Sequence, residues 1–353
     1  MTKSPLTFHE LLKSTIEKYN HNHDPATGRF TSGPGGSSGG GGSKGGSGSS
    51  SKTGLAGKTG TGDAASEVAQ KRKDEAEGKE VFKAADGTYN SLQAHMDANG
   101  NLSPEREALH REIIEKCLAG KTAPDGQPVL RMMGGGPASG KGSVDPIIGT
   151  FDDAHHYKVD PDEVKKMLPG YDKMTKETDQ AACYYHEESS ALAKRIYQEA
   201  LNRGLNVTYD GTGDGSMNSL TKKLNAAKEK GYRTEGEYVT VNVDVALQRN
   251  QSRYEHAIEK GEPARLPPAD YVKKCHAKVT DISVEAAPLF DKITVYDNNG
   301  PKGSTKKIAE GGSGKGLKAV PGEEQAFNDY LSKGAKGLEG FVTLPDGQVV
   351  PVK

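Results

Sequence analysis

The chain has 353 residues, of which 33% are hydrophobic, and its formal net charge is −1. This balance excludes a global electrostatic attraction to nucleic acid or to a membrane surface. No apolar run approaches the length of a membrane span and charges interrupt the N-terminus, so we expect a cytoplasmic protein with neither kind of partner.

The N-terminal region divides into two segments of different composition. Residues 1–32 form a tail in which apolar residues recur at helical spacing, and this predicts a short amphipathic helix over residues 5–20. Such a helix would either dock on a partner or have no role of its own. Residues 33–62 are rich in glycine and serine and have almost nothing to bury, so we expect a disordered linker.

Residues 80–300 repeat a strand-then-helix order in which a polar or charged residue follows each strand. The expected strands are "PVLRMM" (128–133), "YKV" (157–159), "NVTY" (206–209), "YVTVNV" (238–243) and "KITVY" (292–296). Helices are expected over 103–120, 191–204 and 247–261. This alternation predicts an α/β fold, a P-loop NTPase-type three-layer sandwich with a mainly parallel sheet. Ligands of such sheets bind where the strands end.

The glycine-rich loop after the first of these strands satisfies G-x-x-x-x-G-K from Gly135 to Lys141. Glycines let backbone N–H groups approach phosphate oxygens, and a lysine neutralises phosphate charge. The predicted phosphate-binding residues are Gly135, Gly136, Pro137, Ala138, Ser139, Gly140, Lys141, Gly142 and Ser143. Ser143 is also the expected Mg²⁺ ligand. The alternative is a flexible strand-helix connection, and Pro146 predicts that the helix after the loop is short or kinked.

Three further segments follow the loop in order: "VDPDEVKKMLPGYD", "VTYDGTGDGS" and "SRYEHAIEKGEPARLPP". Together with the loop they resemble the zeta toxin family, P-loop kinases that phosphorylate a UDP-activated amino sugar, over roughly residues 100–300. The resemblance implies that Lys141 is the P-loop lysine and Asp162 the catalytic base. It also implies that Arg253 and Arg265 neutralise the transferring phosphate.

The resemblance further implies a substrate-binding segment at Asp210 and Thr212, where well-known members of the family have glutamate in place of Asp210. An arginine that follows this segment in those members is Asp214 here, which reverses the local charge. Glu187 and Glu188 are candidate contacts for substrate or Mg²⁺, although acids in a first helical turn more often complement the helix dipole.

The residues themselves support a phosphoryl transfer, which needs a carboxylate near the acceptor hydroxyl and cations around the γ-phosphate. Of the two aspartates that flank Pro161, Asp160 fits a helix N-cap and Asp162 is the expected base. Arg253 and Arg265 could instead belong to a solvated face.

The expected function is therefore transfer of phosphate from ATP or GTP, with Mg²⁺, to a sugar hydroxyl of a UDP-sugar such as UDP-N-acetylglucosamine. Two alternatives remain: a kinase of another small molecule or nucleotide, and a phage structural or interaction protein with an inactive kinase fold. Residues 20–33 are similar to tails of phage head and portal proteins, so a phage head component is a candidate partner and virion association is a second possible location. An antitoxin is another candidate partner. Residues 301–353 form a C-terminal extension in which "FVTLPDGQVVPVK" predicts a β-hairpin.

Overall fold

The computed structural model describes residues 90–97, 99–177, 181–213, 215–262 and 266–352, and the backbone of 23–24 and 29–30. The chain divides into two units, Met1–Val81 and Phe82–Lys353. In the first unit, β1 (His23–Asp24) and β2 (Arg29–Phe30) pair antiparallel. The helix expected over 5–20 and the linker expected over 33–62 lie outside the described residues.

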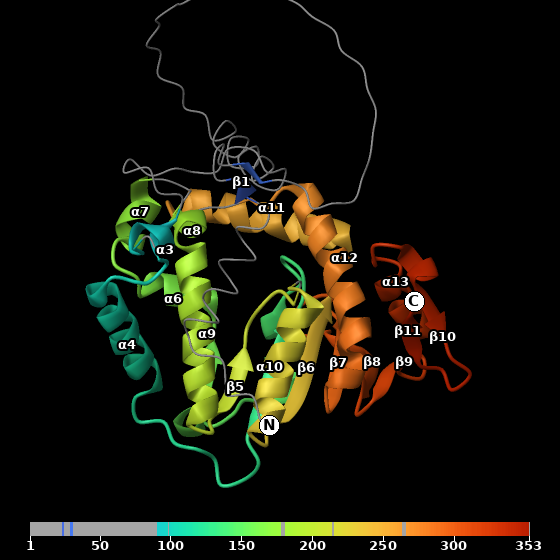
Figure 1. Ribbon diagram of the computed structural model, residues 1–353. Coiled ribbons are helices and arrows are strands. Elements are labelled where there is room, and N and C mark those ends of the chain that lie inside the picture. The colour runs from blue at the N-terminus through green and yellow to red at the C-terminus, as the bar shows by residue number, and fades with distance from the viewer. Residues whose placement is uncertain are drawn as a thin grey trace, which may run out of the picture. The chain divides into compact units, whose positions relative to one another are not determined.

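The second unit contains a nine-stranded sheet, whose strands follow one another from left to right across Figure 1. In spatial order its strands are β10 (Phe341–Thr343), β11 (Val349–Pro351), β9 (Lys315–Ala319), β8 (Lys306–Gly312), β7 (Lys292–Asp297), β6 (Arg233–Thr240), β3 (Val129–Gly134), β5 (Asn206–Tyr209) and β4 (His156–Val159). From β4 to β7 all neighbours are parallel, and from β7 to β10 all are antiparallel. The expected α/β fold with a mainly parallel core is confirmed.

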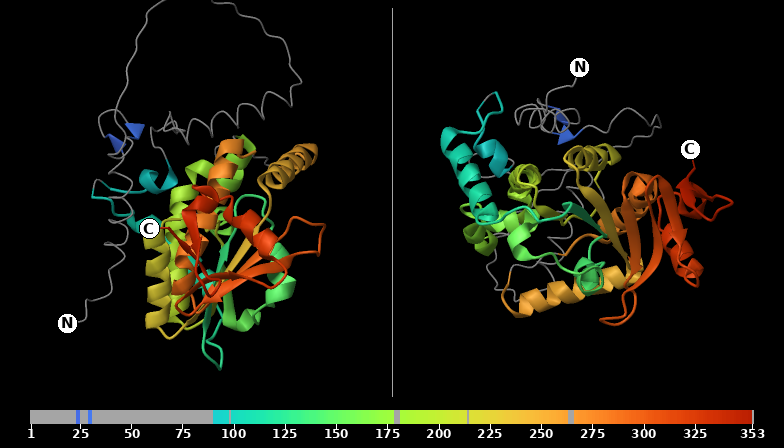
Figure 2. Two further views of the ribbon diagram at one scale, coloured as in Figure 1. Left: turned by 90° about the vertical axis from the view of Figure 1, so that its right-hand side faces the viewer. Right: turned by 90° about the horizontal axis from the view of Figure 1, so that it is seen from below.

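Helices surround the parallel strands. They are α3 (Ser91–Ala94), α4 (Pro104–Leu118), α5 (Asp145–Ile148), α6 (Pro161–Lys166), α7 (Tyr171–Glu177), α8 (Ala181–Tyr184), α9 (His186–Asn202), α10 (Met217–Glu229), α11 (Val243–Glu259), α12 (Ala269–Ala286) and α13 (Glu324–Leu331), with 3₁₀ turns η1 (Lys141–Val144), η2 (Asp153–His155), η3 (Ala287–Leu289) and η4 (Gly337–Gly340). Apolar residues of α9, α10 and α12 pack on one face of the sheet and form the main core. Figure 2 shows α11 on the opposite side of the sheet from α10.

Most expected strands lie where the sequence places them, but the bounds expected for the strand over 238–243 are wrong. The observed strand β6 begins at Arg233 and ends at Thr240, and α11 begins at Val243. The part that the sequence did not predict, before Tyr238, carries Glu235 and Glu237, which are both buried. Two glutamates are unusual in a buried strand, and the charge of Glu235 is compensated by Arg131 of β3, whose guanidinium lies 3.2 Å from the Glu235 carboxylate.

Two local features follow directly from sequence. The segment after the glycine loop forms only η1 and the four-residue α5, with Pro146 in the first turn of α5, so the helix is short. At the C-terminus, β10 and β11 pair antiparallel as a hairpin around Asp346 and Gly347, and β11 joins the main sheet through β9. Residues after 300 thus continue the sheet of the α/β unit.

Candidate functional site

The glycine loop occupies the carboxyl end of β3, between the ends of β5 and β6. Its entry is fixed by the segment after β5, because the Gly135 N–H donates to the Thr212 carbonyl at 2.8 Å. Ala138 and Gly140 have φ angles of 59° and 80°. Left-handed residues of this kind turn neighbouring backbone N–H groups toward one side, which makes a concave anion-binding surface.

A buried histidine supports the loop from α12. The His276 ring donates from Nε2 to the Pro137 carbonyl at 3.1 Å. Burial lowers the pKa of His276 to about 4, so the ring is neutral at pH 7 and adds no charge to the site. A Cβ at Gly136 would lie 2.5 Å from this ring, which leaves no space for a larger residue. The loop is therefore held in shape from behind.

The lysine of the loop faces an aspartate at the end of β5. Lys141 Nζ lies 3.9 Å from Asp210 Oδ1, which is beyond hydrogen-bond distance. The other oxygen of Asp210 accepts from Lys158 Nζ at 2.7 Å. Lys141 and Asp210 remain 24% and 17% exposed, so both can be reached by a ligand. The structure thus brings two expected site residues together, with the ammonium of Lys141 and the carboxylate of Asp210 near each other but not hydrogen-bonded.

The two aspartates after β4 have different surroundings. Asp160 is the N-cap of α6, and its carboxylate accepts from the Asp162 N–H at 2.9 Å, as expected for a cap. Burial, together with the charges of Asp210 and Asp162, raises the pKa of Asp160. The Asp162 carboxylate is 56% exposed and accepts from the buried ammonium of Lys165 at 2.6 Å. Asp162 is therefore the more accessible of the two aspartates.

One arginine of α11, Arg249, approaches the glycine loop. Arg249 donates to the Asn298 carbonyl at 2.9 Å, and its Nη1 would lie 3.8 Å from a Cβ at Gly140. Arg253 is exposed one helical turn further along, on the same face of α11. Arg265 and Asp214 lie outside the described residues. Sequence reasoning missed Arg249, although its i,i+4 spacing to Arg253 was a usable signal.

The two candidate glutamates of α9 are placed differently from each other. Glu188 is fully buried, and its carboxylate accepts from Arg106 at 2.6 and 2.9 Å and lies 2.7 Å from His110 Nε2. Both oxygens are thus engaged by protein groups and shielded from solvent. Glu187 is half-buried at the start of the same helix. The proposed site therefore does not include Glu188.

The residues of the loop fit a phosphate group. Ser139 Oγ is buried and has no hydrogen-bond partner among the described residues, so a polar atom of a ligand could satisfy it. Lys141 supplies a positive charge that no carboxylate of the described residues contacts within hydrogen-bond distance. Ser143, half-buried in η1, offers the one hydroxyl of the loop besides Ser139. These donors suit a nucleotide phosphate, with Ser143 available to a divalent cation.

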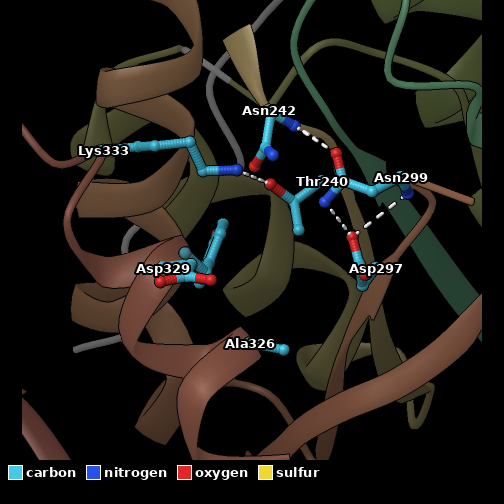
Figure 3. A pocket seen from close by; sticks show the side chains of 8 residues that line it. Thr240, Asn242, Asp297, Asn299, Ala326, Asp329 and Lys333 are labelled. Atoms are coloured by element: carbon cyan, nitrogen blue, oxygen red, sulfur yellow. Dashed lines mark hydrogen bonds between the residues drawn. The ribbon is translucent and has the colours of Figure 1, made fainter. Parts of the chain in front are cut away.

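A small polar pocket lies behind the ends of β6 and β7, next to α13 (Figure 3). Its lining residues are Thr240, Asn242, Asp297, Asn299, Ala326, Asp329, Tyr330 and Lys333. Lys333 donates to the Thr240 hydroxyl and, at 2.9 Å, to the Val241 carbonyl. Burial lowers the pKa of Lys333 to about 8. Lys333, which follows α13, thus connects this helix to the turn before α11.

A glycine loop with a lysine, placed at the carboxyl end of a central parallel strand, defines a P-loop nucleotide-binding protein. The family model described as "Zeta toxin" matches residues 114–303, which is more than half of the chain. The chain therefore belongs to the zeta toxin family, and it is a phosphotransferase of the P-loop kinase class. No curated protein sequence matches it.

One solved structure with a TM-score above 0.5 supports the fold. A chain of the AvrRxo1-ORF1:AvrRxo1-ORF2 complex with sulphate ions has 19% identity and a TM-score of 0.51, and the match covers 75% of this chain and 87% of that one. A chain of the PezAT toxin-antitoxin system of Streptococcus pneumoniae has 17% identity and a TM-score of 0.48, with 60% and 81% covered. None of the helices in the described ranges is long and apolar enough to cross a membrane.

Proposed function

We propose that this protein transfers the γ-phosphate of ATP or GTP to a sugar hydroxyl of a UDP-sugar such as UDP-N-acetylglucosamine. The observation that supports this most directly is the meeting of Lys141 and Asp210 at 3.9 Å beside the glycine loop. A cation for the phosphates and a carboxylate for the acceptor are thereby adjacent at one edge of the sheet. Membership of the zeta toxin family supports the choice of acceptor.

Each residue that binds or transfers the phosphate has a proposed role. The backbone of Gly135 to Ser143 cradles the phosphates, and Lys141 neutralises their charge. Asp162 accepts the hydroxyl proton, and the ammonium of Lys165, 2.6 Å from its carboxylate, holds that side chain in place. Arg253 and Arg265 are proposed to neutralise the transferring group.

Binding of the acceptor and the metal is assigned to other residues. Asp210, Thr212 and Glu187 are proposed to contact the acceptor. Mg²⁺, when bound at Ser143, would add positive charge to the phosphates. An antitoxin is the proposed protein partner, and a phage head component is the alternative.

An acceptor screen tests the substrate class. The full chain is incubated with Mg²⁺, ATP or GTP, and panels of UDP-sugars, nucleotides and free sugars, and mass spectrometry detects added phosphate. We expect phosphorylation of a UDP-sugar. Phosphorylation of another panel member would favour the second candidate, a kinase of a different small molecule. Absence of any turnover, with the protein present in purified virions, would favour the structural alternative.

The base is tested by Asp162→Asn, which keeps the shape of the side chain but cannot accept the proton at neutral pH. We expect the rate of transfer to fall roughly 10²-fold or more, with nucleotide affinity unchanged. Asp160→Asn is the matched control, because Asn also caps helices well and the loss of stability should be about 1 kcal/mol or less. Full activity of Asp162→Asn would move the base elsewhere, with Asp210 the next candidate.

A further inference from the structure

A chain of polar side chains links the glycine loop to the segment after β7. Thr305 Oγ1 lies 3.0 Å from Ser143 Oγ and 2.8 Å from Asn298 Oδ1. Asn298 in turn donates from Nδ2 to the Ser139 carbonyl at 2.8 Å. The loop is therefore contacted twice, once through its serine hydroxyl and once through its backbone, by residues more than 150 positions later in the sequence.

The orientation of the Asn298 amide is fixed by its surroundings. Asn298 is 6% exposed, and its Nδ2 must face the Ser139 carbonyl, because only the NH₂ group can donate. Its oxygen therefore points to Thr305. The flanking residues Asp297 and Asn299 line the pocket of Figure 3 and are hydrogen-bonded to each other, which holds the turn from its other side.

The Thr305 hydroxyl joins this network to the loop serine. It donates toward two acceptors, Asn298 Oδ1 at 2.8 Å and Ser143 Oγ at 3.0 Å, so its one proton is shared between them. The Ser143 oxygen therefore accepts from Thr305. A serine oxygen has two lone pairs, and the second is left for another partner.

We propose that Thr305 is a positioning residue that fixes the Ser143 side chain by donating to one lone pair of its oxygen, with the second lone pair available to a divalent cation. This inference rests on the proposed function, in which Ser143 binds the Mg²⁺ of the nucleotide. Hard cations bind oxygen lone pairs at short distance, so a serine whose side chain could turn away would be a poorer ligand. Groups that orient a metal ligand contribute substantially to metal affinity.

Thr305 matters here because of the spacing of the loop. The hydroxyl of this chain follows the lysine by two positions, after Gly142, and lies in the short η1 turn where no long helix restrains it. Thr305 immediately precedes β8, just beyond the residues that match the family model, and β8 is bound to the sheet through β7. The sheet extension thereby provides a rigid support for the serine.

The test is the Mg²⁺ dependence of ATP binding to the full chain, measured by titration calorimetry with Mg²⁺ and with EDTA. The ratio of the two dissociation constants reports the cation's contribution. Thr305→Val keeps the shape but removes the hydroxyl, and we expect this ratio to fall about tenfold. Thr305→Ser keeps the hydroxyl and should restore the ratio to within about twofold of the wild type, again judged against that scale.

A second background separates this role from a general effect on the loop. In Ser143→Ala, Thr305→Val should change the ratio no further, because the residue through which Thr305 acts is gone. Equal weakening of binding with and without Mg²⁺ by Thr305→Val, in a variant whose circular dichroism is unchanged, would overturn the inference while leaving the proposed function standing. Absence of ATP binding by the wild type would overturn both.

Discussion

Two acidic side chains near the carboxyl edge of the sheet, Asp210 and Glu188, differ in how their charges are compensated. Asp210 is partly exposed, with one ammonium at 2.7 Å and another at 3.9 Å. Glu188 is completely buried between Arg106 and His110, with contacts of 2.6 to 2.9 Å. The first arrangement can exchange a lysine for a ligand at little cost, whereas the second cannot open without stranding buried charges.

The same contrast extends to the neighbours of each acid. Arg195 forms a bidentate pair with Glu107 at 2.7 and 3.0 Å and also approaches His110, so the charges around Glu188 form a closed network between α4 and α9. Around Asp210, the lysines come from β4 and from the glycine loop, and both retain exposure. Both places contain a buried or half-buried acid. The candidate site differs from the scaffold because the charge of its acid is only partly compensated by neighbouring cations.

Removal of the Glu188 charge, which is fully compensated by its neighbours, should have the largest effect on stability. Glu188→Gln leaves the buried guanidinium of Arg106 without its counter-charge, so we expect the free energy of unfolding in urea to fall by about 3–5 kcal/mol. Glu187→Gln, its half-buried neighbour, is the control and should stay within about 0.5 kcal/mol. A stable Glu188→Gln variant that had lost acceptor binding would instead place Glu188 in the site.

Removal of the Lys141 charge, which lies near Asp210 in the candidate site, should act on binding and leave the fold intact. Lys141→Ala deletes the cation nearest the glycine loop, and we expect transfer to fall by about 10²- to 10³-fold with weaker ATP binding. Unfolding in urea should be almost unchanged, because the contact with Asp210 is long. Titration calorimetry measures the affinity, and unaltered ATP binding would contradict the P-loop assignment.

The pH dependence of stability gives a smaller, graded version of the first experiment. Burial alone would raise the pKa of Glu188, but hydrogen bonds from His110 and Arg106 lower it from 4.5 to about 2. A lowered carboxyl pKa stabilises the fold above the unfolded value and loses that stabilisation as pH falls toward the folded value. The wild type should therefore lose about 3 kcal/mol between pH 5 and pH 2 that Glu188→Gln does not lose. Parallel pH profiles of the two proteins would refute this.

Residues that support the site were harder to predict than residues within it. The glycine loop, the aspartates after β4 and the segment after β5 were recognisable because each is a local motif at a strand end. His276, Asn298 and Thr305 carry no such motif, since a histidine in a helix or a polar residue in a turn is ordinary. Their roles depend on which distant backbone they face.

The sequence by itself determined what is local: the period of the parallel strands, the glycine loop, the Asp160 cap, the short helix at Pro146 and the C-terminal turn at Asp346. These features follow from φ/ψ preferences and short-range hydrogen bonds, which neighbouring residues specify. Tertiary structure alone decided that Glu188 is buried and fully paired, that Asp210 stays partly exposed and that Thr305 contacts Ser143. The contacts of Glu188 with His110 and of Thr305 with Ser143 join residues 78 and 162 positions apart, and their energies depend on burial and distance, which no local pattern encodes.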